Sequence, residues 1–272
     1  MHHSTLRALR VAVVGAAAAC LALTGLVVST GGAASAGTTP PPLDHFLCYT
    51  APSVGFQPNA NLLIKNAIQP AYFPPKILGV GTHCNPANKS VPVALFPAKN
   101  PLAHLYCWNI AYAAKPVRVN LSNQFGKAVM TTGPSPSKLC LPSWKSNIGP
   151  PNMAVNQPPR LDHFTCYPLV VVAGAYGFRF PSFVKAEDEF NAPNYTALKL
   201  GVANQLCVPT FKMAAGVVYA PQSANDLSLV CYPSSPTPYW KLIWDQNQFG
   251  TGRVTPNPRL EEFCVPTTAL IG

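Results

Sequence analysis

The regular spacing of the cysteines constrains the fold of this chain more than any other feature. From Cys48 onward the cysteines come in four pairs. The first cysteine of a pair recurs at Cys107 and Cys166, each time after 59 residues, and at Cys231 after 65. A fixed period of this kind predicts copies of one supersecondary unit. We number the units by their cysteines: unit 1 has Cys48 and Cys84, unit 2 has Cys107 and Cys140, unit 3 has Cys166 and Cys207, and unit 4 has Cys231 and Cys264.

Three short motifs recur with the cysteines. The first cysteine follows LDHF-x in units 1 and 3, LAHLY in unit 2 and a looser DLSLV in unit 4, and the second cysteine is always followed by x-Pro. Between them, Asn-Gln-Phe-Gly occurs at 123–126 and again at 247–250. Weaker copies are Glu189-Phe190 in unit 3 and Asn66-Ala67-Ile68 in unit 1. We call this third motif the mark.

The motifs also differ in a pattern of two. Units 1 and 3 share the LDHF start, whereas units 2 and 4 share the full mark and a cysteine separation of 33 residues. This pattern predicts a two-unit block that was itself duplicated, with blocks at 43–145 and 161–272 joined by a proline-rich linker at 146–160. A single continuous array is the alternative, because the gaps between units (23, 26 and 24 residues) are nearly equal.

The N-terminus resembles an export signal. Two arginines, Arg7 and Arg10, precede the apolar run Val11–Val28, and the small residues Ala34-Ser35-Ala36 follow. We therefore expect residues 1–36 to be a signal peptide and 37–42 a short proline-rich linker. An uncleaved membrane anchor is the alternative, because the run is nearly long enough to span a bilayer. With the signal removed, we expect a secreted or envelope-associated protein without a stable membrane span.

Eight cysteines after an export signal indicate a disulfide framework. They allow 105 pairings, and the repeat favours pairing within units or between neighbours. Neighbour pairing leaves Cys48 and Cys264 to join across the whole chain, whereas pairing within units leaves nothing over. We expect the second scheme: Cys48–Cys84, Cys107–Cys140, Cys166–Cys207 and Cys231–Cys264.

The expected fold class is all-β, a disulfide-stapled sandwich or barrel-like architecture of four repeats. Proline interrupts most stretches that could form an amphipathic helix. In the segment before the first cysteine, Phe46 and Cys48 share one face of a strand, so the bulky residue two places before each cysteine should enter the core with the sulfur. Further strands are expected at 117–121, 127–131, 176–180 and 241–244.

Three histidines, His45, His104 and His163, each stand three residues before a cysteine. They are weak candidates for a shared metal site, which would require the repeats to close around an axis. The alternative is a structural histidine that donates to a backbone carbonyl of its own unit. Unit 4 has Ser228 at this position.

Charge is unevenly divided between the two halves. Residues 37–150 hold nine Lys and Arg against one acid, whereas 151–272 hold eight of each. A basic half outside the cell could bind an anionic envelope polymer or glycan. The residues that would do so are Lys65, Lys76, Lys89, Lys99, Lys115, Arg118 and Lys127.

The second block offers a rival, catalytic function. A carbohydrate-active hydrolase would need a cleft that gathers two or more carboxylates. The available acids are Asp162, Glu187, Asp188, Glu189, Glu261 and Glu262. The sequence has no nucleophile elbow, phosphate loop or dinucleotide motif, so we expect no cofactor and no enzyme activity. We expect no nucleic-acid partner either, because no recognition motif is present.

The combined motifs Leu-Asp-His-Phe-x-Cys-Tyr, Gln-Phe and Leu-Cys-x-Pro resemble a secreted bacterial tandem-repeat domain family of unknown function. The resemblance covers essentially the whole chain after the signal and implies no catalytic residue. The expectation is therefore a secreted, non-catalytic binding or structural module. A hydrolase that uses the acids above and a metal-binding module that uses the histidines remain the alternatives.

Overall fold

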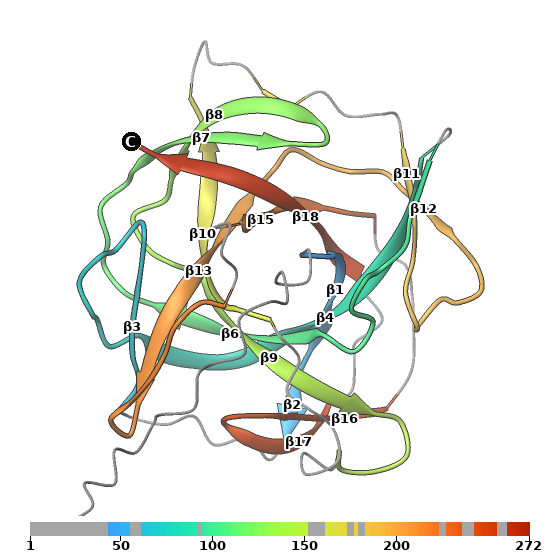
Figure 1. Cartoon of the computed structure of the whole chain (residues 1–272), viewed down its shortest axis with the longest axis horizontal. Helices are drawn as coiled ribbons and strands as arrows, with labels where there is room; N and C mark the ends of the chain where they lie inside the picture. Colours follow the sequence, from blue (N-terminus) through green and yellow to red (C-terminus); the bar gives the residue numbers. More distant parts are fainter. Residues whose placement is uncertain are drawn as a thin grey trace, which may run out of the picture. The chain divides into compact units, whose positions relative to one another are not determined.

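The two cysteines of every unit lie on neighbouring antiparallel strands, and the four strand pairs close into a ring. This is seen in a computed structural model of the chain (Figure 1), which describes residues 43–54, 61–91, 94–151, 161–172, 177–178, 183–222, 227–235, 242–254 and 260–272. Each strand of the ring pairs with the next and the last pairs with the first, which makes an eight-stranded barrel. In order, the strands are β1 (His45–Ala51), β4 (Lys76–Val91), β6 (His104–Ala111), β9 (Lys138–Ser146), β10 (His163–Val171), β13 (Gln205–Ala214), β15 (Leu227–Pro233) and β18 (Leu260–Ile271).

The barrel interior is filled with side chains that repeat from unit to unit. Alternate residues of a strand point inward, so the residue two before the first cysteine enters with the sulfur, as expected. These residues are all buried: Phe46, Leu105, Phe164 and Leu229. All four disulfides lie in this interior and join the cysteines of one unit directly across a strand pair, in the expected pairing. The space left between these side chains is only about 10 Å³, so the barrel is a packed core and not a channel.

The outer face of the barrel is buried as well, under shorter strands. Leu47 and Tyr49 point outward from β1 and belong to a second apolar core between the barrel and the outer segments. Each unit contributes outer strands between or after its barrel strands. They are β2 (Ser53–Val54), β3 (Leu63–Asn66), β5 (Ala94–Phe96), β7 (Arg118–Asn123), β8 (Gly126–Thr132), β11 (Val184–Glu187), β12 (Thr196–Leu198), β14 (Val217–Tyr219), β16 (Ile243–Asn247) and β17 (Gly250–Val254).

The outer segments interlace the four units. The outer strand of each unit pairs with the far end of the second barrel strand of the unit two places along: β3 with β13, β7 with β18, β11 with β4 and β16 with β9. In Figure 1 these four segments surround the ring at the left, top, right and bottom. The arrangement repeats around an approximate fourfold axis, and every unit is held by strands of other units.

The interlacing decides how the two predicted blocks are organised. The described residues, which begin at Leu43, form one compact unit in which strands of the first block pair with strands of the second. The predicted linker at 146–160 begins inside β9, which ends at Ser146, and residues 152–160 lie outside the described part of the chain. The blocks are therefore a feature of the sequence pattern and not two separate bodies.

The strands expected at 117–121 and 127–131 are confirmed as β7 and β8. Of the strand expected at 241–244, residues 243–244 belong to β16. The segment 176–180 is described only at 177–178, which are not in a strand. The signal peptide at 1–36 and the linker at 37–42 lie outside the described residues. The part of the chain that the structure describes contains no helix that could span a bilayer.

Candidate functional site

The mark is the tip of each outer segment, and its residue types follow from its geometry. Asn123 and Gly126 face each other across the β7–β8 turn, and the Asn123 side chain accepts a hydrogen bond of 2.8 Å from the backbone amide of Phe125. Asn and Asp favour such turns because their short side chains reach the amide two residues on. Gly126 has a φ of 107°, a conformation that side chains disfavour. The side chains of Asn66, Asp188 and Asn247 likewise accept a hydrogen bond from the backbone amide two residues on.

The aromatic residue of the mark anchors it on another unit. Phe125 lies edge-on to Tyr232 with ring centroids 5.4 Å apart, and the Nδ2 of Asn123 donates to the Tyr232 hydroxyl at 2.9 Å. The corresponding rings Phe190 and Phe249 pack on Tyr49 and Trp108. In each case the partner follows the first cysteine of the unit two places along. The mark thus fixes the interlacing.

The second residue of the mark meets a histidine of the preceding unit. The Nε2 of His45 lies 3.1 Å from the Oε1 of Gln124, and the Nε2 of His163 lies 3.3 Å from the Oε1 of Gln248. A lysine five residues after the second cysteine completes each group, and Lys89 donates to Gln124. We call these groups corners: corner 1 is His45, Lys89 and Gln124; corner 2 is His104, Lys145 and Glu189; corner 3 is His163, Lys212 and Gln248.

The lysines of corners 1 and 3 are buried beneath an aromatic ring. The Nζ of Lys89 lies 4.0 Å from the ring centroid of Phe96, and that of Lys212 lies 3.9 Å from the centroid of Tyr219. Burial lowers the pKa of both ammonium groups to about 8. Burial and the charge of the neighbouring lysine also lower the pKa of His45 to about 4 and that of His163 to about 3. Both histidines are therefore neutral at pH 7.

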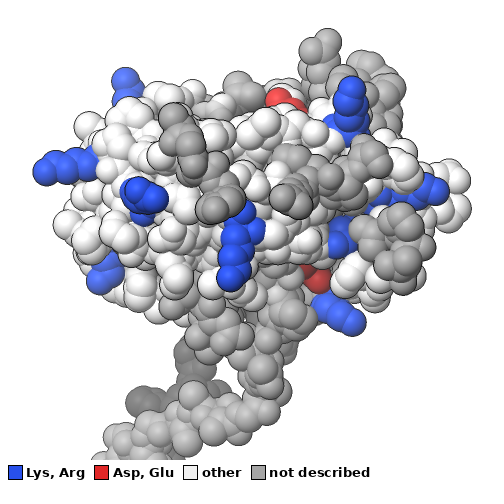
Figure 2. Space-filling model, turned by 90° about the horizontal axis from the view of Figure 1, so that it is seen from above, with Lys and Arg blue, Asp and Glu red and all other residues white. Residues whose placement is uncertain are grey.

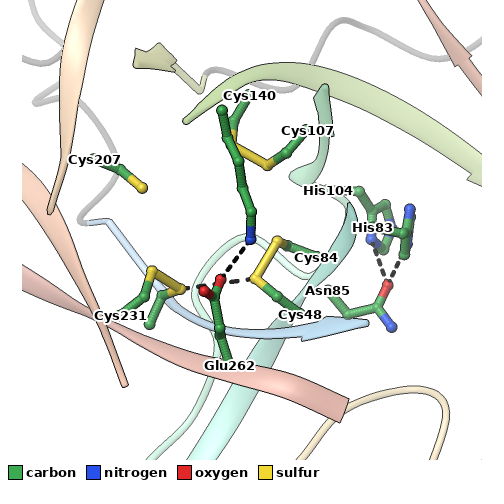
Figure 3. The surroundings of a disulfide bond; sticks show 12 residues. Cys48, His83, Cys84, Asn85, His104, Cys107, Cys140, Cys207, Cys231 and Glu262 are labelled. Carbon is green, nitrogen blue, oxygen red and sulfur yellow. Dashed lines mark hydrogen bonds and ion pairs between the residues drawn. A yellow bond between two sulfur atoms is a disulfide. The ribbon is translucent and has the colours of Figure 1, made fainter. Parts of the chain in front are cut away.

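Corner 2 extends into a buried polar network. Here unit 1 has His83 and Asn85 beside its second cysteine, where the other units have apolar residues. The Oδ1 of Asn85 lies 2.7 Å from the Nε2 of His83 and 3.1 Å from the Nδ1 of His104, and Figure 3 shows both rings turned toward this amide. On its other side, the Nδ1 of His83 lies 2.8 Å from Asp245. His83 and Asp245 are fully buried, so no substrate could reach this pair.

Asp188 closes the network at its far end. The Nδ2 of Asn85 donates to the Oδ2 of Asp188 at 3.0 Å. Burial raises the pKa of the Asp188 carboxyl, while the bond from Asn85 opposes this shift. Glu189, the next residue, is the half-exposed end of corner 2 and forms an ion pair with Lys145. The network therefore holds units 1, 2, 3 and 4 together and reaches solvent only at Glu189.

Corner 4 lacks the imidazole, the ammonium group and the amide or carboxylate of the other corners. Its positions are taken by Ser228, Ala269 and Ala67, which all line a hollow of about 430 Å³. Lys65 and Phe211 line the same hollow. The Nζ of Lys65 lies 4.8 Å from the ring centroid of Tyr72 and 4.9 Å from that of Phe211. One of four equivalent positions is thus open where the other three are filled by the chain itself.

The three histidines that were candidates for a shared metal site are not brought together. The repeats do close around an axis, but each histidine points outward to a different corner. The expected alternative, a bond to a backbone carbonyl of the same unit, is also wrong: His45 and His163 contact side chains of the next unit. Among the described residues, the only grouping with metal-ligand spacing is Cys231, Glu262 and Cys264. Its sulfurs are joined in a disulfide and are not available as thiolate ligands.

The predicted basic residues are placed unequally. Lys76, Lys99, Lys115, Arg118 and Lys127 are exposed and Lys65 is half-buried, but Lys89 is only 2% exposed. Lys89 therefore cannot belong to a polymer-binding surface, because its ammonium is used in corner 1. Charge counting could not detect this. The signal that could was positional: lysine stands five residues after the second cysteine in units 1, 2 and 3.

The predicted acids have separate internal partners. Asp162 accepts from the amide of Gln222, Asp188 from Asn85 and Glu261 from Thr50. Glu262 lies inside the barrel with Lys138, Glu189 pairs with Lys145, and Glu187 with Tyr195. Each of these six carboxylates therefore contacts a different residue of the chain itself.

Four disulfides fit a protein of an oxidising, extracellular compartment. In comparisons with known proteins, no family model, no curated protein and no solved structure matches the chain.

Proposed function

We propose that this protein acts outside the cell as a non-catalytic binding module for anionic envelope polymers. The observation that carries the proposal is the separation of charge between surface and interior. Outside, the exposed Lys and Arg are Lys76, Lys99, Lys115, Arg118, Lys127, Lys185, Lys199 and Arg253. Within the described residues, Glu189 is the one exposed acid, and it is paired with Lys145.

Most of the acidic side chains are buried inside the protein. Five of them are buried: Asp44, Asp162, Asp188, Asp245 and Glu262. Figure 2 shows one face on which Lys and Arg are spread widely while Asp and Glu reach the surface in few places. A dispersed basic surface suits a flexible polyanion, which can follow charges that do not form a single pocket. This arrangement gives less support to a hydrolase, whose two carboxylates must share a cleft.

Three exposed basic residues of the first block lie on or next to the β7–β8 hairpin. Lys115, Arg118 and Lys127 are exposed there, and no salt bridge is recorded for any of them among the described residues. Their charges are therefore available to a polymer. We expect this hairpin to contribute more to retention than the same number of charges placed elsewhere.

The experiment measures retention on beads that carry dextran sulfate, with uncharged dextran as the reference. Retention should require the sulfate groups and should weaken steeply between low salt and 0.5 M salt, because exposed charges are screened. The test variant is Lys115→Glu/Arg118→Glu/Lys127→Glu. The matched control is Lys185→Glu/Lys199→Glu/Arg253→Glu, which changes the net charge equally.

We expect the test variant to weaken binding at least tenfold and the control to weaken it less than threefold. Equal losses would show that net charge alone sets retention and would remove the role of the first block. Absence of sulfate-dependent retention by the unaltered protein would overturn the proposal as a whole.

A further inference from the structure

We propose that corner 4 is a binding site for a small aromatic carboxylate, a site separate from the basic surface. The proposal starts from the fourfold repetition. Three corners are filled by an imidazole, an ammonium group and an amide or carboxylate of the chain itself. At the fourth, Ser228, Ala269 and Ala67 leave a hollow of about 430 Å³, within the range of small-ligand sites.

The shape that is missing at corner 4 is that of a ring. In corner 1 the imidazole of His45 stacks on Phe263, with ring centroids 5.7 Å apart and planes 6° from parallel. Ser228 takes the place of this ring in unit 4, and the hollow there has apolar walls, among them Phe211 and Pro221. A planar ring of a ligand would recover the packing that the histidine provides elsewhere.

The charge at corner 4 selects an anion. Lys65 lines the hollow, and its ammonium is held between the rings of Tyr72 and Phe211. None of the residues that line the hollow is acidic, and within the described part of the chain Lys65 has no carboxylate partner. An ammonium restrained by two rings is a preorganised partner for a carboxylate.

A hydroxyl group also lies among the residues that line the hollow. It belongs to Ser228. A hydroxyl can donate a hydrogen bond to a carboxylate oxygen or a ring substituent of a ligand. Size, wall chemistry and polar groups therefore agree on a ring with one negative charge.

The test uses 2-naphthoate as the probe and 2-naphthamide as its neutral analogue, titrated into the full oxidised chain by calorimetry. The key variant restores the side chains of the other corners: Ala67→Gln/Ser228→His/Ala269→Lys. A second variant, Lys65→Gln, removes only the cation, and Lys185→Gln is its control because Lys185 is exposed and does not line this hollow.

We expect saturable binding of naphthoate with one molecule per chain, and at least tenfold weaker binding of the amide. The refilled variant should lose at least tenfold in affinity, Lys65→Gln should lose at least fivefold for naphthoate only, and Lys185→Gln should match the unaltered protein. If the refilled variant does not fold, Ser228→His alone replaces it, and shifts of the Ala269 and Ile271 methyl signals on naphthoate addition locate the site.

Two results would overturn the proposal: no saturable naphthoate binding up to millimolar concentration, or unchanged binding by a folded refilled variant. The outcome is independent of polymer binding, because the refilled variant should keep its retention on dextran sulfate.

Discussion

The Nζ of Lys138 lies 2.9 Å from the Oε2 of Glu262, inside the barrel, and this ion pair joins unit 2 to unit 4. The two side chains occupy equivalent positions, two residues before the second cysteine. The other two units have the neutral residues Thr82 and Gln205 there, and all four line the same interior. The pair therefore neutralises two charges that the fold places in a region largely closed to water.

Replacing Lys138 by Met should destabilise the protein by about 3 kcal/mol, because Glu262 would stay in the interior without its partner. The double variant Lys138→Met/Glu262→Leu should lose clearly less, since no charge remains inside. Denaturant unfolding with intact disulfides measures both free energies. A double variant that is less stable than Lys138→Met would show that the pair itself, and not the unpaired charge, is what matters.

The disulfides give the second prediction. Peptide mapping without reduction should recover only the four bonds within units. Removing one bond with Cys107→Ala/Cys140→Ala opens a loop of 33 residues and should cost about 4 kcal/mol in the loop-entropy description, with a further loss from the cavity in the barrel core. Thermal unfolding measures this loss. Bonds that cross between units would contradict the assignment.

How far the sequence predicts this architecture can be judged from Phe46 and His45. The alternation of strand faces places Phe46 in the core beside Cys48, and the structure agrees. The partner of His45 could not be inferred, because Gln124 lies 79 residues away and reaches it only through a strand that crosses to another unit. The spacing of the repeats and the alternation of strand faces can be read from short stretches of sequence. The interlacing of the units depends on how all eight barrel strands pair in the closed ring.

Corner 4 is a second example of a contact between units that the sequence alone could not predict. The sequence reveals that unit 4 has Ser228 in place of histidine and that unit 1 has a weak mark. That these two departures meet at one position, together with Ala269, follows only from the pairing of β3 with β13 and of β15 with both β13 and β18. Lys89 was misassigned for a related reason, because composition counts charges without showing which of them are buried.

The third prediction concerns the mark. Gly126 has a φ of 107° and no heavy atom within 4 Å of the position that a Cβ would take, so alanine there meets backbone strain but no clash. Gly126→Ala should cost about 1–2 kcal/mol. Gly149→Ala is the control, because Gly149 has equal space and no positive φ. Equal stabilities of the two variants in denaturant unfolding would rule out strain at the mark.

The last prediction is the dependence of stability on pH at corner 3. Burial and the charge of Lys212 depress the pKa of His163 to about 3 in the folded protein, from about 6.5 in the unfolded chain. Between these values the unfolded chain binds more protons, so the contribution of His163 is fully present above pH 6.5 and is lost as the pH falls. The free energy of unfolding should therefore fall more steeply between pH 6.5 and 4 in the unaltered protein than in His163→Gln, by up to about 1.4 kcal/mol per pH unit. The carboxyl of Asp188, whose pKa is raised, acts in the opposite direction but equally in both proteins, so it cancels in the comparison. Parallel curves for the two proteins would mean that His163 is not desolvated at this corner.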